Sequence, residues 1–234
     1  FADGQKGAAA AQLAKAGLDI DALVDHGDFS GKSGELLLLT DTGELPCERV
    51  LLVGCGPRDD FDRSALRNAL CAAFGWLGNR PYSGAACLLT HERVSGADAF
   101  RSARIVAEVW HHTNYQFTEM KSKPDEKPGT LEALTVGVRA AKAGRAARKG
   151  VAQGDALGQG CSFSRRLANL PGNVCTPSYL ADTAKTLARG TRNLKCKVLN
   201  ESDMKNLTIV FEALRSTLFK VVSSANTTHH FVSL

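Results

Sequence analysis

The pattern of apolar and polar positions predicts alternating strands and helices in the first 139 residues. Amphipathic spacing indicates three helices, over residues 8–23, 62–77 and 97–110. Short apolar runs indicate four strands, over residues 35–40, 49–53, 85–90 and 131–138. Strands that alternate with helices are typical of an α/β fold. We therefore expect a three-layer α/β/α domain with a mixed sheet over residues 1–139.

The second half of the chain predicts a long helix and then a new unit. Helical pattern runs over residues 140–170 and must stop at Pro171, which has no amide hydrogen to donate. Thr176 is placed to cap the next helix, with Pro177 at its favoured first position. A strand over residues 195–199 follows this helix. We expect 140–170 to be a linker helix and the remainder to begin a truncated second α/β unit.

Composition narrows the class of protein without naming a function. Hydrophobic residues make up 44% of the 234 residues and charged residues 23%, as in ordinary globular proteins, while aromatic residues reach only 6%. No apolar run approaches the ~18 residues of a membrane span, and no secretory signal is visible. We expect a cytoplasmic protein with no membrane partner. The chain opens at Phe1, and we expect its start to be missing.

Several short motifs have alternative interpretations, which stay open at this point. The seven cysteines are scattered without a CxxC pair, which favours free thiols in a reducing compartment. Residues 50–57 resemble the strand and first glycines of a dinucleotide-binding turn, but Asp59 takes the place of the third glycine. A plain strand-to-helix turn is the alternative. His111 and His112 are adjacent and do not share a helix face, which argues against a joint metal site. Asp41 begins a segment typical of a hairpin turn.

A basic segment at the start of the long helix is the clearest charge feature. Residues 139–149 hold five positive and no negative side chains: Arg139, Lys142, Arg145, Arg148 and Lys149. At this spacing on a helix, the five would form one positive stripe. Such a stripe can contact the phosphates of DNA. A solvated face of a linker helix is the alternative interpretation.

A resemblance to a known family appears in residues 158–207. Gly160-Cys-Ser-Phe-Ser-Arg165-Arg-Leu-Ala-Asn169-Leu-Pro-Gly-Asn173-Val-Cys-Thr-Pro177 resembles the junction of the leucyl aminopeptidases, the cytosol aminopeptidases of the M17 type. There a helix ending in R-x-L-x-N-x-P-x-N links an N-terminal domain to the catalytic domain. Upstream, residues 49–56 and 27–32 resemble the strand and the loop of that N-terminal domain. The resemblance implies that Asn169, Pro171, Asn173, Thr176 and Pro177 are structural junction residues.

The resemblance also implies a function that this chain carries only in part. In that family two divalent metals, manganese or zinc, hydrolyse N-terminal residues from peptides, and the enzyme is a hexamer. The ligands lie in motifs of the form V-G-K-G-I-T-F-D-T-G-G and N-T-D-A-E-G-R-L, neither of which occurs here. Residues 171–207 would start the catalytic domain, and residues 208–234 do not match the family. We therefore assign no catalytic residue and no metal ligand, and we expect this chain to bind no cofactor and to be inactive as written.

Three functional hypotheses remain. The first is a fragment of a leucyl aminopeptidase, whose full-length form acts on peptides. The second is a module for DNA binding, regulation and homo-oligomer formation that uses the basic segment. The third follows from the similarity of the family's N-terminal domain to the macrodomain fold, which binds ADP-ribose elsewhere; fold alone does not carry function, and Asp59 would repel a phosphate.

Overall fold

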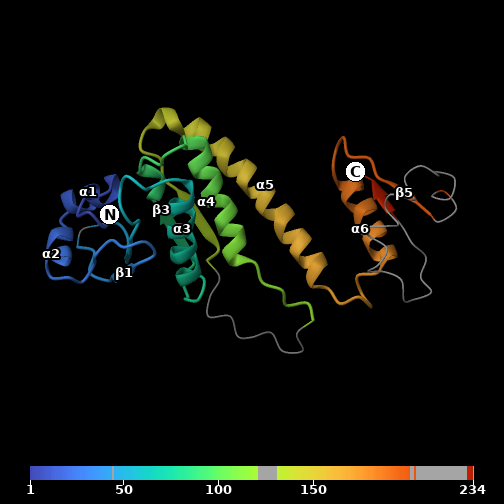
Figure 1. The fold of residues 1–234 in the computed structure, drawn as a ribbon, viewed down its shortest axis with the longest axis horizontal. Helices are drawn as coiled ribbons and strands as arrows, with labels where there is room; N and C mark the ends of the chain where they lie inside the picture. Colours follow the sequence, from blue (N-terminus) through green and yellow to red (C-terminus); the bar gives the residue numbers. More distant parts are fainter. Residues whose placement is uncertain (44, 121–130, 201–202, 204–230, 234) are drawn as a thin grey trace. The chain divides into compact units, whose positions relative to one another are not determined.

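The computed structural model describes residues 1–43, 45–120, 131–200, 203 and 231–233. The chain divides into two compact units, Phe1–Arg165 and Arg166–Leu234, and each is described by itself (Figure 1). The predicted tail over 208–234 lies outside the described residues except for 231–233.

Two short helices stand where the pattern predicted one helix over residues 8–23. Helix α1 covers Ala8–Lys15 and helix α2 covers Ile20–Asp25. Gly17 has a positive φ of 95°, a conformation that ends a helix and that glycine adopts without steric cost. The Asp19 side chain then accepts a hydrogen bond from the Ala22 amide and caps α2. The turn at Gly17 therefore breaks a continuous apolar spacing, and the single-helix prediction was wrong here.

Strands β1 and β2 form an antiparallel pair. β1 covers Leu36–Leu39 and β2 covers Val50–Val53, with Leu37 opposite Leu52. Both strands are apolar at every position, which is typical of strands covered on both faces. On one face Leu52 packs with Ile20 and Phe29 of the α1–α2 region, and on the other Val53 packs against the main core.

The main core lies between helices α3 and α4. α3 covers Arg63–Leu77 and α4 covers Ala99–Asn114. Aspartates cap both helices: Asp62 accepts from two amides at the start of α3, and Asp98 from the Arg101 amide. The largest fully buried side chains are those of Phe61, Leu66, Leu70, Val106 and Val109.

Strands β3 and β4 form a parallel pair that α4 connects. β3 covers Gly84–Cys87 and β4 covers Ala133–Val136, with Ala85 opposite Leu134. A 3₁₀ turn, η1, follows β3 at Leu89–His91, where the sequence pattern predicted more strand. The helical connection between parallel strands is the arrangement expected of an α/β fold.

Helix α5 covers Gly144–Asn169 and runs beside α4 (Figure 1). Three glycines face α4 at four-residue spacing, so that the two main chains approach closely. A Cβ on Gly150 would lie 2.1 Å from the Phe100 carbonyl oxygen, and one on Gly154 would lie 2.4 Å from that of Arg104. A Cβ on Gly158 would lie 2.5 Å from the His111 ring. The α4 residues that these glycines contact follow one another along α4 in the same order as the glycines along α5, so the two helices run parallel.

The second unit contains helix α6 and one described strand pair. α6 covers Pro177–Gly190, close to the predicted helix. Strand β5, Lys197–Leu199, pairs antiparallel with β6, Phe231–Ser233. The sequence pattern predicted β5 but not β6.

The α/β class predicted from the sequence is confirmed. In the described residues the strands form three two-stranded pairs, β1–β2, β3–β4 and β5–β6, rather than one continuous sheet. β2 and β3 are not hydrogen-bonded to each other, because a cavity separates them. None of the described helices combines the length and the apolar content that crossing a membrane requires.

Candidate functional site: an exposed basic segment and an apolar slot

All five side chains of the basic segment are exposed, but they do not share one helix. Arg139 and Lys142 precede α5, and Lys142 lies in the 3₁₀ turn η2, Ala141–Ala143. Ala140 is extended, with φ −137° and ψ 139°, so the α-helix begins at Gly144 and not at residue 140. The expected single stripe over 139–149 is therefore confined to Arg145, Arg148 and Lys149 on the helix itself.

The helix residues of the basic segment point away from the protein core. Ala147 and Gly150 are buried on the α4 side of α5, while Arg145, Arg148 and Lys149 lie on the opposite face. In the described part of the chain, none of the five basic side chains makes an ion pair. Their charge is therefore free to attract an anion from solution.

The described residues do not assemble a metal centre. No group of three or more histidine, cysteine, aspartate or glutamate side chains lies close enough together, within the described ranges, to hold a metal ion. His111 Nε2 lies 2.6 Å from Asp155 Oδ1 and so joins α4 to α5, while His112 is exposed. A two-metal centre therefore does not fit the residues described here, and no chemical step is assigned to them.

The turn after β2 is filled by the protein's own main chain. A Cβ on Gly54 would lie 2.0 Å from the Lys32 carbonyl oxygen, so only glycine fits there. The Ala2 amide donates to the Gly56 carbonyl oxygen at 2.9 Å, and the Gly56 amide donates to Gly31. The Gly54 amide likewise donates to the Glu35 carbonyl oxygen, so both glycine amides that a pyrophosphate would need as donors are already used within the protein, which favours the plain-turn interpretation of residues 50–57.

The junction residues lie around the start of α6. α5 ends at Asn169, and Pro171 follows. The Pro171 carbonyl oxygen accepts hydrogen bonds from the Val174 and Cys175 amides. Thr176 Oγ1 accepts from the Tyr179 amide at 3.3 Å, and Pro177 occupies the first helical turn. Asn173 is exposed. The predicted cap at Thr176 is present in the structure.

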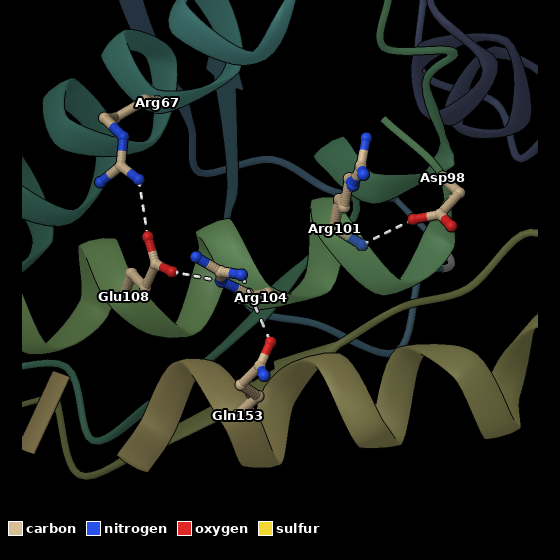
Figure 2. A network of polar contacts seen from close by, with 6 residues as sticks. All are labelled: Arg67, Asp98, Arg101, Arg104, Glu108 and Gln153. Atoms are coloured by element: carbon tan, nitrogen blue, oxygen red, sulfur yellow. Dashed lines mark hydrogen bonds and ion pairs between the residues drawn. The ribbon is translucent and has the colours of Figure 1, made fainter. Parts of the chain in front are cut away.

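A polar network links three helices of the first unit (Figure 2). Glu108 on α4 accepts from Arg104 Nε at 2.6 Å and from Arg67 of α3 at 2.7 Å. Arg104 also donates to Gln153 Oε1 of α5 at 3.3 Å. Burial would raise the pKa of Glu108, but the hydrogen bonds and charges of the two arginines outweigh it and hold the pKa below its ordinary value. The network therefore needs an ionised Glu108.

A cavity of about 870 Å³, which we call the slot, separates β2 from β3. Its two long walls are the strands Val50–Val53 and Gly84–Cys87. Apolar residues of α1 and α2 line one further side and those of α3 another: Ala9, Leu13, Ile20, Leu70, Phe74 and Leu77. The slot therefore lies between two helical layers.

At the carboxyl ends of β2 and β3, the slot is lined by two thiols and one carboxylate, those of Cys55, Cys87 and Glu92. Burial raises the pKa of the Cys55 thiol and that of the Cys87 thiol to about 11 each. Glu92 is only 8% exposed. Its Oε1 accepts from the Ala9 amide at 3.2 Å and so caps α1, whose N-cap residue Gly7 has no side chain for this role. Its Oε2 is buried and has no hydrogen-bond partner in the described part of the protein.

Sequence reasoning missed both the slot and the close contact of α4 with α5. The glycine spacing of four at 150, 154 and 158 was a visible signal for the helix contact. The slot had no such signal, because nothing in the spacing of apolar residues indicates which strands lie apart.

Comparison with protein families gives a match over the first half of the chain. Residues 1–124 match the N-terminal domain of the cytosol aminopeptidase family. A probable cytosol aminopeptidase of Chromohalobacter salexigens is 40% identical over 189 residues, which cover 80% of this chain and 37% of that protein. One of Aromatoleum aromaticum is 38% identical over 214 residues, covering 88% and 42%. The chain thus spans about two fifths of the length of these relatives.

Solved structures with the same fold include a maturation enzyme and a leucine aminopeptidase. The bottromycin maturation enzyme BotP in complex with Mn has a TM-score of 0.65 and 25% identity, over 82% of this chain and 38% of that one. A mutant of tomato leucine aminopeptidase has a TM-score of 0.63 and 23% identity, over 86% and 39%, and supports the fold alone. The match over residues 1–124, which is more than half of the chain, shows that the chain belongs to the cytosol aminopeptidase family.

Proposed function

We propose that this chain is the N-terminal part of a metal-dependent aminopeptidase, which removes N-terminal residues from peptides when its catalytic domain is present. The observation that carries the proposal is the family match over residues 1–124. The metal-binding motifs of the family are absent from the 234 residues, and the described residues form no metal-binding group. The chain by itself then contributes a folded domain and no catalytic group.

A chimera tests this proposal. The part of the Chromohalobacter salexigens relative that matches this chain over 189 residues is replaced by the matching part of this chain, and hydrolysis of leucine-p-nitroanilide is measured with Mn²⁺ and with a chelator. We expect chelator-sensitive turnover from the chimera and none from the 234-residue chain alone. A folded chimera without turnover, or turnover from the chain alone, would contradict the proposal.

The names of the relatives also support a cytoplasmic location. The family resemblance supports a homo-oligomer, hexameric as in the family. Size-exclusion chromatography with light scattering on the chimera tests the oligomeric state. A monomeric chimera would contradict that part of the proposal.

A second candidate function is binding of an anionic polymer such as DNA through the basic segment. The specific observation in its favour is that five exposed cationic side chains make no ion pair within the described residues. Each phosphate contact made by such a residue releases counterions, so that binding weakens as salt rises.

Replacement of Arg145 and Arg148 by Ala tests the second function. The double variant should bind duplex DNA more weakly, and the slope of log affinity against log salt should fall by about 2. The matched control replaces Arg189 and Arg192, two exposed arginines of the second unit, and should leave the slope unchanged. Absence of salt-dependent binding to duplex DNA at low ionic strength would exclude this function.

A further inference from the structure

A small cavity in the second unit brings a free thiol next to two cationic side chains. The cavity, which we call the thiol pocket, has a volume of about 270 Å³ and is lined by Lys185, Ala188, Arg189 and Cys196. The first three lie on one face of α6, at the spacing of three and four residues that makes side chains neighbours on a helix. Cys196 comes just before β5, so the thiol pocket lies between α6 and the start of that strand.

The surroundings of the thiol pocket are positively charged. Residues 183–200 contain no carboxylate and five cationic side chains: Lys185, Arg189, Arg192, Lys195 and Lys197. Lys185 Nζ lies 3.0 Å from Oδ1 of the exposed Asp182, so its charge is partly neutralised. Within the described ranges the other four cations make no ion pair. Their field therefore attracts small anions to the thiol pocket and repels small cations.

Cys196 has a matched counterpart in the same unit. Both Cys196 and Cys175 are free, half-buried thiols, but the charge around them differs. Residues 167–181, on both sides of Cys175, include no charged side chain, whereas Lys195 and Lys197 flank Cys196 directly. In the folded chain the pocket adds Arg189 to these two lysines. Cys175 is therefore an internal reference for the effect of charge on the reaction of Cys196.

The size of the thiol pocket limits what can enter it. Sites that enclose a drug-sized ligand have volumes of about 300–1,000 Å³, and the thiol pocket lies just below this range. It can therefore take one arm of a small molecule, such as the carboxylate-bearing end of a short peptide, but not a nucleic acid duplex. A thiol in such a place can react with a ligand that carries a disulfide, because a thiolate attacks disulfide sulfur.

We propose that the thiol pocket is a site of reversible modification, at which Cys196 forms a mixed disulfide with a small disulfide that carries carboxylates. The thiol of Cys196 gives its proton to solvent, and the thiolate attacks one sulfur of the ligand. A new S–S bond forms as the old one breaks, and the other half of the ligand leaves as a thiolate that takes up a proton. Cys196 is oxidised and the released thiol is the reduced product. Arg189 and Lys185 bind the carboxylates of the incoming ligand.

This modification is independent of the two functions proposed above. It needs only residues 185–196 of the second unit, and it requires neither a metal nor the basic segment. A chain that fails to support aminopeptidase activity or DNA binding can therefore still show it.

Disulfide reagents of different charge test the proposal. The full 234-residue chain is treated at low ionic strength with glutathione disulfide, which is anionic, bis(2-hydroxyethyl) disulfide, which is neutral, or cystamine, which is cationic. Mass spectrometry of the peptides gives the rate of modification at Cys196 relative to that at Cys175. We expect this ratio to be at least about tenfold higher for glutathione disulfide than for the neutral reagent, and lowest for cystamine. Added salt should reduce the difference.

Two charge variants test the pocket itself. Arg189→Gln removes a cation that lines the thiol pocket and should lower the preference of Cys196 for glutathione disulfide by at least about threefold. Arg192→Gln is the matched control, because it removes the same charge from an exposed residue outside the pocket lining. It should change the preference much less. Both arginines are exposed, so we expect neither substitution to disturb the fold.

Denaturation separates the effect of the pocket from that of the flanking lysines. In denaturing urea Lys195 and Lys197 still flank Cys196, but Lys185 and Arg189 no longer lie beside it. We expect the preference for glutathione disulfide to fall at least to the value found for Arg189→Gln.

Four results would overturn the proposal. Cys196 could fail to react with glutathione disulfide, or its rate relative to Cys175 could be the same for all three reagents. Equal effects of Arg189→Gln and Arg192→Gln would show that the general charge of the region acts, and not the pocket. A preference that is unchanged in urea would assign the effect to the flanking lysines alone.

Discussion

The contact between α4 and α5 leads to opposite expectations for the same substitution at two glycines of one helix. Gly154 faces α4, where an added Cβ would lie 2.4 Å from the Arg104 carbonyl oxygen and 2.9 Å from Ala107 Cβ. Gly160 is exposed on α5, and an added Cβ there would have no atom within 4 Å. Both positions belong to the first unit.

The free-energy balance differs in sign between the two sites. Alanine in place of glycine within a helix stabilises it by about 0.8–1.0 kcal/mol. Gly160→Ala should receive this gain alone. At Gly154 the Cβ meets main chain, which cannot rotate away, and overpacking of this kind costs about 1–3 kcal/mol. Since the same helix gain applies at Gly154, we expect Gly154→Ala to destabilise the first unit by up to about 2 kcal/mol, so that the variants differ by about 1–3 kcal/mol.

Urea unfolding followed by circular dichroism measures this difference. With a urea dependence of about 2 kcal/mol per molar, the two midpoints should differ by roughly 1 M, on opposite sides of the unaltered chain. If Gly154→Ala raises the midpoint as Gly160→Ala does, the close approach of α4 and α5 does not exist in solution and the reasoning fails.

Three further predictions concern caps, charge and thiols. Asp62→Ala removes the acceptor of two amides at the start of α3 and should cost about 1–2 kcal/mol in the same unfolding assay, whereas an unchanged midpoint would contradict its capping role. Glu108 has a folded pKa below its ordinary 4.5, so its stabilisation is present above that pH and is lost as the pH falls through the folded pKa. Glu108→Gln should thus lower stability at pH 7 and much less below the folded pKa; an equal effect at both would be contrary evidence. At pH 8 a thiol reagent should modify exposed Cys47 quickly and Cys55 and Cys87, with pKa values of about 11, only after unfolding, as mass spectrometry of the labelled peptides would show.

The sequence predicted most elements but not their spacing in three dimensions. Apolar periodicity placed α3 and α4 within a few residues, because aspartate caps and apolar faces are local signals. It joined α1 to α2, since the positive φ of Gly17 is a property of the backbone that the apolar pattern does not record.

In the candidate sites, too, residue types reveal some features, whereas others depend on the three-dimensional fold. The charge of the basic segment was evident from residue types, but its start before α5 depended on the extended backbone at Ala140. The slot depends on which strand edges remain unpaired, and the unpartnered oxygen of Glu92 comes from a fold that brings residue 92 to the start of α1. Such contacts are long-range in sequence and leave no periodic pattern.

The polar network around Glu108 has a consequence for the order in which the first unit opens. One carboxylate holds α3 through Arg67, and the same Arg104 that it binds reaches Gln153 of α5 (Figure 2). Loss of α3 would remove one of the two arginines that neutralise the partly buried Glu108, and loss of α5 would remove the hydrogen bond between Arg104 and Gln153. Local fraying of α4 alone is therefore costly, and the three helices, with α5 counted up to Arg165, should exchange their amide hydrogens as one cooperative foldon. In native-state hydrogen exchange their slowest amides would then share a single opening free energy, distinct from that of α1 and α2.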